Sequence, residues 1–376
     1  MSLIYFDNAA TSRIKPDEVY DAFNYFVKEI GVSPSRGSYG LAIDASRMLY
    51  KSRKTIMEFF GGTNPNNVVF TKNSTEAINL FLNGFLMKGD HVIISPYEHN
   101  AVLRPIHNLS LTKRINYSII NEADLYSDDL SDLDKYISNK TKLVAITLAS
   151  NLTGQIVFSK RIAEYFNNKG IKVFVDSSQG GGKRLIDISK DNIDYLAFTG
   201  HKDLFGLPGV GGLCTKNELV IPPLIQGGTG IFGDSYINPE TYPDGYEAGT
   251  LNMPAIWALK SGIDYILRNG EQIKVTEEKL MERLLGGLKN VKRVKVYNEN
   301  YNRVPTLCFN IENKNSSEVV EILNEKEICT RGGIHCSILA HKTIGTDKIG
   351  AVRVSLNHFN NFNEIDAFLE VIERIR

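Results

Sequence analysis

The sequence predicts an α/β protein whose main sheet is largely parallel and covered by helices. Helix-like and strand-like segments alternate from about residue 16 to residue 215, as in parallel strands joined by helical connections. The chain has 376 residues, more than one hydrophobic core usually supports, so we expect two domains. We place a large domain at residues 1–250 and a smaller C-terminal α/β domain at residues 251–376. Residues 1–15 are also candidates for packing against the smaller domain.

The elements of the large domain follow from apolar spacing. "PDEVYDAFNYFVKEI" and "DASRMLYKSRKTIMEFFG" have the spacing of amphipathic helices. Short apolar runs predict strands, in chain order "NVVFT", "DHVIISP", "INYSII", "KLVAITLAS", "IKVFVDSS", "DYLAFTG" and "GGLCT". Helical stretches such as "TEAINLFLNGF" and "KRIAEYFNNKG" separate most of them. A segment rich in glycine and proline, from Pro222 to Thr250, then interrupts the pattern, and its length predicts a functional loop.

The C-terminal part has its own alternation. "NMPAIWALKSGIDYILRNG" and "EQIKVTEEKLMERLLGGL" are predicted to be two helices. The strands that we expect after them are "VKRVKVYN", "PTLCFNIE" and "GAVRVSLN", with helices "SSEVVEILNEK" and "NEIDAFLEVIERI" around them. This pattern predicts a second, smaller α/β unit.

Composition excludes several classes of protein. The content of 42% hydrophobic and 23% charged residues is typical of a soluble globular protein. Lys+Arg and Asp+Glu both number 43, so no basic excess favours nucleic acid or an anionic membrane surface. No apolar run is long enough to span a bilayer, and the N-terminus lacks the pattern of a signal peptide. The four cysteines have no CxxC spacing, so we expect no disulfide scaffold, no metal site and a reducing cytoplasm.

Polar clusters follow three predicted strands of the large domain. Because ligand sites gather at the carboxyl ends of parallel strands, we expect these clusters to lie close together. One cluster also resembles the first turn of a helix, where hydroxyls and free amides bind anions. The clusters are Asp176 with Gln179, then Thr199 with His201 and Lys202, and Ser74 with Thr75 and Glu76.

Taken singly, each cluster has a more ordinary explanation. An aspartate after a strand is usually a turn or cap residue, a lysine there is usually a solvated charge, and "STE" usually caps its own helix. Together they supply an anion seat, a carboxylate and a lysine, which is the set that pyridoxal 5′-phosphate requires. The lysine forms a Schiff base with that cofactor, and the carboxylate keeps its pyridine nitrogen protonated.

The full set of motifs resembles a known family. "YFDNAATS", "STEAINL", "VDSSQ", "FTGHKDLFGLPGVGGL", "EAGTLN" and "RGGIHC" occur in the order found in class V aminotransferases, specifically cysteine desulfurases. The resemblance extends from Tyr5 to the C-terminal helix, and "RGGIHC" is similar to the RxGxHC loop of the desulfurases with a short cysteine loop. It implies a fold-type I PLP-dependent transferase, a homodimer and active sites at the subunit interface.

The resemblance also assigns roles to residues. Lys202 would form the Schiff base, Asp176 would pair with the pyridine nitrogen, and Gln179 would contact the phenolic oxygen. His99, which alone would pass for a surface loop histidine, would stack on the ring and take part in catalysis. The residues that would hold the phosphate are Ser74, Thr75, Thr199, His201 and, from the partner subunit, Thr250.

Arginines would bind the carboxylate of the amino acid substrate. A planar guanidinium can do so through two hydrogen bonds, and Arg353 matches the family's arginine at that position, although an arginine in an alternating strand usually faces solvent. Asn151 would assist at the carboxylate and the ring. Arg331 and Arg36 are further substrate-binding candidates. The chain departs from the family at two positions: Ser35 and Ile334 stand where the family often has histidine. Neither difference removes a catalytic group, so we expect them to affect the choice of substrate or partner.

Cys336 is the residue on which the functional interpretation depends. Cysteine is usually a buried core residue, but the resemblance makes Cys336 the nucleophile that takes sulfur from L-cysteine and leaves L-alanine. Lys202 would move the Cα proton, and Gly332 and Gly333 would help the cysteine loop to move. The other cysteines are weaker candidates: Cys214 and Cys308 have packed strand positions, and Cys329 lies near the loop.

Alternatives remain open at this point. They include a selenocysteine lyase, a lyase of cystine or cysteine sulfoxides, an aminotransferase, and a non-catalytic sulfur-transfer scaffold. Cys336 argues against an aminotransferase, while Lys202, Asp176 and His99 argue against a scaffold. The expected partners are L-cysteine or L-selenocysteine and a protein sulfur acceptor, which would serve iron–sulfur cluster assembly or another sulfur pathway.

Overall fold

The protein contains a large sheet of seven strands, described here by a computed structural model that covers residues 3–34 and 37–375. The strand order is β2-β8-β7-β6-β5-β3-β4. Only β8 runs antiparallel to its neighbours, which confirms the predicted α/β fold with a mostly parallel sheet. The strands are β2 (Val68–Thr71), β3 (His91–Ile94), β4 (Asn116–Ile119), β5 (Thr141–Thr147), β6 (Lys172–Asp176), β7 (Tyr195–Thr199) and β8 (Gly211–Thr215).

Helices cover both faces of this sheet. Side chains alternate between the faces, so Val173 and Val175 of β6 join one apolar cluster while Phe174 joins the other. The first cluster includes residues from α2 (Gly40–Phe59), α6 (Lys160–Asn168) and α7 (Met253–Asn290), and the second includes α3 (Ser74–Phe85) and α4 (Asn100–Thr112). The remaining helical elements before α7 are α1 (Asp17–Tyr25), η1 (Phe26–Ile30), η2 (Pro65–Asn67), α5 (Glu122–Leu125), η3 (Leu130–Tyr136) and η4 (Asp244–Tyr246).

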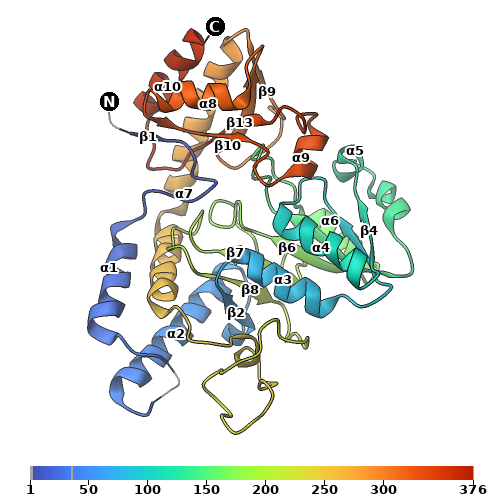
Figure 1. Ribbon diagram of the computed structural model, residues 1–376, viewed down its shortest axis with the longest axis vertical. Coiled ribbons are helices and arrows are strands. Elements are labelled where there is room, and N and C mark those ends of the chain that lie inside the picture. Colours follow the sequence, from blue (N-terminus) through green and yellow to red (C-terminus); the bar gives the residue numbers. More distant parts are fainter. Residues whose placement is uncertain (1–2, 35–36, 376) are drawn as a thin grey trace.

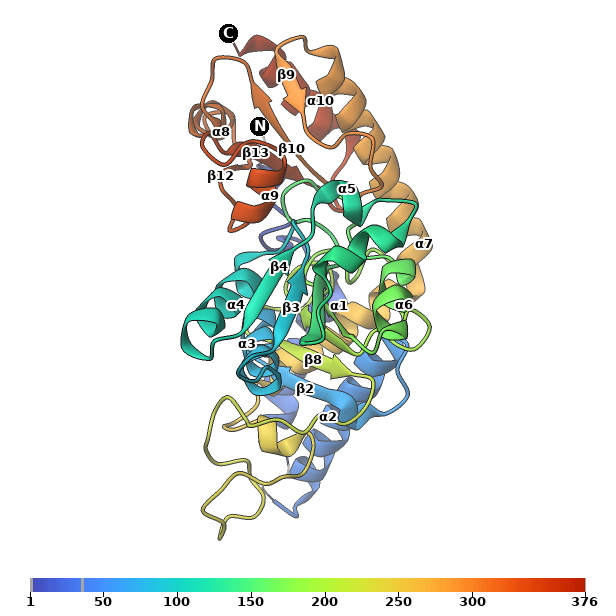
Figure 2. The ribbon, with the colours of Figure 1, turned by 90° about the vertical axis from the view of Figure 1, so that its right-hand side faces the viewer.

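A second sheet of four antiparallel strands lies beside the first (Figures 1 and 2). Its order is β12-β13-β10-β9, and its core packs against α10 and the C-terminal part of α7. Its strands are β9 (Val294–Val296), β10 (Thr306–Ile311), β12 (Arg331–Gly333) and β13 (Ala351–Ser355). Its helices are α8 (Ser316–Asn324), α9 (Ile338–Thr343) and α10 (Phe362–Arg374).

One long helix connects the two sheets, where the sequence predicts two shorter helices. α7 continues for 38 residues through Gly270, and a side chain at that glycine would meet no other atom within 4 Å. A single glycine lowers helix propensity without breaking the helix when both ends are packed. The prediction of two helices was therefore wrong.

The N-terminal residues pack with the second sheet. β1 (Ile4–Tyr5) pairs in parallel with β11 (Ile328–Cys329), and the Phe6 ring packs edge-on against Phe368 of α10, with the ring centroids 5.7 Å apart. Both chain ends accordingly lie in the upper part of Figure 1. The division of the chain into domains at residue 250 stays a prediction.

The long segment between β8 and α7 is held to the first sheet at Glu247. Its carboxylate accepts hydrogen bonds from Arg53 Nη1 at 2.8 Å, from Arg53 Nη2 at 2.5 Å and from the Phe70 backbone N–H at 2.6 Å. Both charged side chains are buried. A buried pair of this kind is strongly destabilised when one partner is removed, because the other charge is left without compensation.

We therefore predict that Glu247→Ala lowers the free energy of unfolding by about 3–5 kcal/mol, since Arg53 would be buried without its partner. Glu240→Ala, at an exposed position of the same segment, should change it by less than about 0.5 kcal/mol. Denaturant unfolding of the two variants beside wild type measures the difference. Equal stability of both variants would contradict the account.

Candidate active site

A pocket lies at the carboxyl ends of the parallel strands. It is formed by residues that follow β5, β6 and β7 and by the starts of α3 and α4. Nine predicted site residues line it, namely Ser74, Thr75, His99, Asn151, Asp176, Gln179, Thr199, His201 and Lys202. Sequence reasoning missed three more, Asn73, Thr147 and Ser178. Asn73 directly precedes the motif "STEAINL" and Ser178 lies within "VDSSQ", so their position beside predicted residues was the available signal.

The start of α3 is built to receive an anion. Asn73 caps the helix by accepting from the Glu76 N–H at 2.9 Å, so the first helical residues are Ser74 and Thr75, as predicted. Amides of a first turn have no acceptor within their own helix. The buried Thr199 hydroxyl, which also lines this pocket, has no hydrogen-bond partner among the described residues. These donors together fit a phosphate group.

A glycine of β8 allows this close arrangement. A Cβ placed on Gly211 would lie 2.6 Å from the backbone carbonyl carbon of Asn73 and 2.7 Å from the Phe198 oxygen. Real Cβ atoms do not approach other atoms so closely, so any side chain at this position would push the start of α3 away from the strand.

Asp176 ends β6 and is buried. Its Oδ1 accepts from the Ser178 N–H at 3.0 Å and from the Ser178 hydroxyl at 2.5 Å. The Ser178 hydroxyl oxygen also lies 2.7 Å from that of Ser74, so Ser178 connects the carboxylate with the anion seat. Since both hydrogen bonds reach Oδ1, Oδ2 is available to a ligand. Gln179 donates to the Ala9 carbonyl at 2.7 Å, which brings the N-terminal segment to the pocket.

Lys202 follows β7 in a setting that favours its neutral amine. Burial lowers the pKa of Lys202, and the charges of Arg353 and Arg331 lower it further, while Asp176 and Asp203 oppose the shift. A lysine acts as a nucleophile or base only when it is deprotonated, so this shift suits Lys202 to covalent chemistry.

His99 is held as a neutral imidazole with a defined tautomer. It caps α4 by accepting from the Ala101 N–H at Nδ1, at 3.0 Å, so its proton resides on Nε2. Burial lowers the pKa of His99 to about 4, and Lys202 adds to this shift. Nε2–H is therefore the group that His99 presents to a ligand.

Glu98, which the sequence reasoning did not single out, fixes the turn that carries His99. Its Oε1 accepts from the Thr147 N–H at 2.7 Å and from the Ser95 hydroxyl at 2.5 Å. The side chain is fully buried, and this burial raises the pKa of Glu98 to about 8, although the two hydrogen bonds oppose the shift. A protonated Glu98 adds no negative charge beside Asp176 near neutral pH.

Arg353 lies in β13 directly opposite Arg331 in β12, and only 1% of it is exposed. Its guanidinium donates to the Asn151 carbonyl at 2.9 Å and to the Asp7 carboxylate at 2.5 Å. Its Nε–H has no partner among residues 3–34 and 37–375. Arg353 therefore does not face solvent, as an arginine in an alternating strand usually does. Its guanidinium retains one free donor, the Nε–H.

Cys336 is exposed and sits in a strained turn of residues 334–337. The Ser337 N–H donates to the Ile334 carbonyl at 3.0 Å, and the two central residues, His335 and Cys336, have φ values of 54° and 56°. Left-handed conformations cost residues other than glycine roughly 1–2 kcal/mol each, so other contacts must stabilise the turn.

The contacts that stabilise this turn come from the first sheet. The Asn100 N–H, next to His99, donates to the Cys336 carbonyl at 2.8 Å. Asn151 donates from Nδ2 to the His335 carbonyl at 2.8 Å and accepts from the Ser337 hydroxyl at Oδ1. Asn151 thus contacts the cysteine loop as well as the pocket, a role that sequence reasoning missed. These bonds place the backbone of Cys336 at the start of α4, next to His99, which lines the pocket.

The two glycines before the turn, which we expect to help the cysteine loop to move, are part of strand β12. Gly332 and Gly333 pair with Val352 and Ala351 of β13. A Cβ on Gly332 would lie 2.9 Å from the Ser316 carbonyl oxygen, and Gly333 has a φ of 103°. The glycines therefore permit close packing against α8 and an unusual backbone conformation.

Other predicted residues lie elsewhere. Thr250 is exposed and does not line the pocket, and Arg36, like Ser35, falls outside the described residues. Cys214 and Cys308 are buried; burial raises the pKa of both thiols, that of Cys308 to about 12. Such thiols are poor nucleophiles, in contrast to an exposed one.

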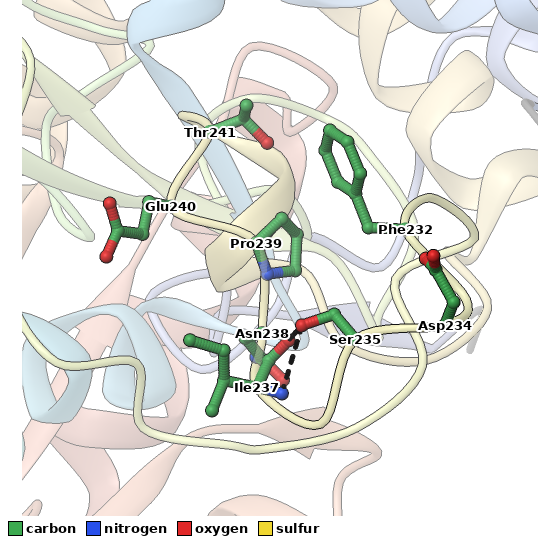
Figure 3. Close-up of a pocket in the computed structure, with 8 residues that line it drawn as sticks. All are labelled: Phe232, Asp234, Ser235, Ile237, Asn238, Pro239, Glu240 and Thr241. Atoms are coloured by element: carbon green, nitrogen blue, oxygen red, sulfur yellow. Dashed lines mark hydrogen bonds between the residues drawn. The ribbon is translucent and has the colours of Figure 1, made fainter.

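A second, open pocket lies in the segment between β8 and α7 (Figure 3). Eight residues between positions 232 and 241 line it, and Asp234 and Glu240 are the charged ones. Its lining lacks a lysine, histidine or cysteine, so it offers no nucleophile or base comparable to the first pocket.

Comparison with known proteins agrees with this geometry. The sequence model of the "Aminotransferase class-V" family matches residues 4–368. The chain belongs to the class V aminotransferase family. A protein named "Probable cysteine desulfurase" from Pyrococcus abyssi is 32% identical over an alignment of 383 positions. The alignment covers 99% of this chain and 94% of that protein. A "Cysteine desulfurase" from Wigglesworthia glossinidia brevipalpis is 30% identical and covers 100% of this chain, with 93% of its own length covered.

A solved structure titled "Apo structure of Cysteine Desulfurase from Thermococcus onnurineus NA1" is similar, with a TM-score of 0.90 and 33% identity, over 99% of this chain and 94% of that one. The predicted family resemblance and fold class are confirmed. The names of the relatives favour the cysteine desulfurase interpretation over the alternatives. Within the described residues, no helix is long and apolar enough to cross a membrane.

The packing role of Gly332 leads to a prediction. Gly332→Ala should lower the free energy of unfolding by about 1–3 kcal/mol because the new Cβ overlaps the Ser316 oxygen. Gly286→Ala is the matched control, since this exposed position in α7 has no atom within 4 Å of the new Cβ and should be stabilised by about 0.5–1 kcal/mol. Thermal or denaturant unfolding measures both. Unchanged stability of Gly332→Ala would contradict this packing role.

Proposed function

We propose that the protein is a pyridoxal 5′-phosphate-dependent cysteine desulfurase that converts L-cysteine to L-alanine and retains the sulfur as a persulfide on Cys336. The observation that carries the proposal is the position of the exposed Cys336 turn. Its backbone is bound by Asn100, directly after His99, at the pocket that holds Lys202 and Asp176. A transaminase needs no thiol at that place.

The residues of the pocket fit the cofactor. The amides at the start of α3 and the unpaired Thr199 hydroxyl suit its phosphate, together with Ser74, Thr75 and His201. Asp176 Oδ2 suits the pyridine nitrogen, Gln179 suits the phenolic oxygen, and His99 suits the ring face. When bound at Lys202, the cofactor withdraws electrons from the bonds at the substrate Cα.

Lys202 would act twice. Its neutral amine would hold the cofactor covalently. It then removes the Cα proton as a general base and holds it close to the reacting carbon. The lowered pKa of Lys202 supports both tasks, because each requires an unprotonated amine.

The arginines of the second sheet would orient the substrate. Support comes from the free Nε–H of Arg353 and from Arg331, which faces it across the two strands; both would offer positive charge to the substrate carboxylate. Asn151, whose carbonyl orients Arg353, would take part in this site, and Arg36 is proposed as a further contact.

The sulfur step balances without an external oxidant. The Cys336 thiolate attacks the sulfur of L-cysteine, an S–S bond forms and the Cβ–S bond breaks. The electron pair of the broken bond goes to the carbon side, where protonation yields L-alanine. His99, with its proton on Nε2, is a candidate to move a proton there. Cys336 is left as a persulfide.

We further propose a homodimer with the sites at its interface. The supporting observation is a set of exposed apolar side chains on α1, η1 and α2 and on the long segment before α7, including Tyr25, Val27, Tyr50, Phe232 and Tyr236. Thr250 would reach the partner's phosphate seat from this segment. A protein thiol would be the sulfur acceptor, in iron–sulfur cluster assembly or a related pathway, with L-selenocysteine as an alternative substrate. A free exposed thiol fits a reducing compartment such as the cytoplasm.

Product analysis tests the role of Cys336. With L-cysteine and a reductant, wild type should release alanine and sulfide in equal amounts. Cys336→Ala should lose about 100-fold or more of this activity while keeping the cofactor, because the nucleophile is gone. Cys329→Ala, at the half-buried cysteine nearby, should stay within about twofold of wild type. Pyruvate and ammonia as main products would instead identify an eliminating lyase.

The cofactor itself is tested by spectroscopy. Purified protein supplied with pyridoxal 5′-phosphate should be yellow, and borohydride should fix the cofactor covalently to the peptide containing Lys202. Lys202→Ala should bind the cofactor without becoming covalently attached to it. Lys216→Ala, at an exposed position after β8, should behave as wild type. A colourless protein that cannot be reconstituted would overturn the proposal.

A further inference from the structure

A chain of hydrogen bonds runs through the interior behind the Cys336 turn. His341 of α9 is fully buried; its Nδ1 lies 2.7 Å from the Thr346 hydroxyl, and its Nε2 lies 3.3 Å from His335 Nδ1. His335 Nε2 lies 3.0 Å from the carbonyl oxygen of Arg331. The two imidazole rings are nearly parallel, with an interplanar angle of 10° and centroids 5.5 Å apart.

The Arg331 carbonyl, at one end of this series of hydrogen bonds, determines the direction of every bond in it. The Arg331 carbonyl can only accept, so His335 Nε2 carries the proton and, in a neutral ring, Nδ1 accepts. His341 must then donate from Nε2, which leaves its Nδ1 to accept from the Thr346 hydroxyl. Neutral rings thus satisfy all the donors and acceptors with a single choice of tautomers.

The surroundings keep both rings neutral. Burial lowers the pKa of His335 to about 3, with Arg353 and Arg331 adding to the shift. Burial also lowers the pKa of His341 to about 4, although hydrogen bonds with the backbone of Thr346 and Ile334 and the charge of Asp347, in the segment after α9, oppose this shift. A proton added to the pair would place a further positive charge beside two guanidinium groups.

This series of hydrogen bonds ends at the strained turn itself. His335 is one of the two residues with a left-handed backbone, and its ring reaches back to the first residue of β12. This bond closes residues 331–335 into a loop. His341 orients the His335 ring through its hydrogen bond to Nδ1, on the opposite side of the ring from the Arg331 carbonyl. Neither His341 nor Thr346 lines the pocket.

We propose that His341 is a positioning residue for the Cys336 thiol, which holds the turn in its left-handed form by donating a hydrogen bond to His335. The consequence for sulfur transfer rests on the proposed function. The effect on the turn does not, and it can be measured without substrate.

The test compares two substitutions of His341. His341→Phe keeps much of the ring volume and removes the donor, whereas His341→Gln keeps an N–H at the position of Nε2. In the cofactor-loaded protein, hydrogen exchange of the Ser337 and Asn100 amides, whose acceptors belong to the turn, should be about 10-fold faster in the Phe variant. It should return to within about threefold of wild type in the Gln variant.

Turnover of L-cysteine provides a second readout. We expect kcat to fall about 10-fold in His341→Phe, with KM and the cofactor absorbance unchanged, because a misplaced thiol affects the chemical step. The Gln variant should recover most of this loss. The control His107→Phe, at an exposed histidine of α4, should match wild type in exchange and turnover.

The same variants test the charge state of the pair. The folded pKa values of His335 and His341 lie below the ordinary value of 6.5, so the unfolded chain binds these protons first as pH falls. Stability should therefore decrease from about pH 6.5 toward pH 4. His341→Phe removes one of the two groups and should lose less stability between pH 7 and pH 5 than wild type.

Equal exchange at Ser337 in wild type and His341→Phe would overturn the proposal. Identical behaviour of the Phe and Gln variants would also overturn it, since a purely structural role depends on volume rather than on the donor. If wild type does not turn over L-cysteine at all, the proposed function fails, while the exchange measurement still decides the role of His341.

Discussion

The hydrogen bond from the Asn100 N–H to the Cys336 carbonyl is the contact on which the arrangement of the site depends. Asn100 begins α4, which packs on the first sheet. Cys336 lies 236 positions later, in the turn that follows β12 of the second sheet. This bond places the backbone of the exposed Cys336 beside Asn100, the neighbour of His99, which caps α4 and lines the pocket. Together with the two hydrogen bonds of Asn151 to the same turn, it joins the part of the molecule that carries Cys336 to the part that carries Lys202.

The N-terminal segment reinforces the same junction from another side. Asp7 pairs with the buried Arg353 of the second sheet, while the Ala9 carbonyl accepts from Gln179 of the pocket. Ser12 follows with a backbone bond to the His201 carbonyl at 3.1 Å, next to Lys202. These three contacts connect Arg353, the pocket and the residue before Lys202 through one stretch of chain.

Sequence reasoning was most successful where local rules apply. The carboxyl ends of parallel strands meet at one edge, so Asp176 and Lys202 could be placed together before the structure was known. It failed where the outcome depends on contacts distant in sequence. The pairing of Gly332 with β13 and the two hydrogen bonds of Asn151 to the cysteine turn involve partners that no local pattern indicates. The single α7 was missed for a related reason, because packing at both ends outweighs one glycine.

The central claim is that Cys336 receives the sulfur atom. The most direct measurement is mass spectrometry of the peptides of the cofactor-loaded protein, mixed with one equivalent of L-cysteine in the absence of reductant. The account predicts a mass increase of one sulfur atom on the peptide that contains Cys336, together with one equivalent of alanine. Alanine or sulfide released while that peptide remains unmodified, or sulfur found on Cys329 instead, would contradict it.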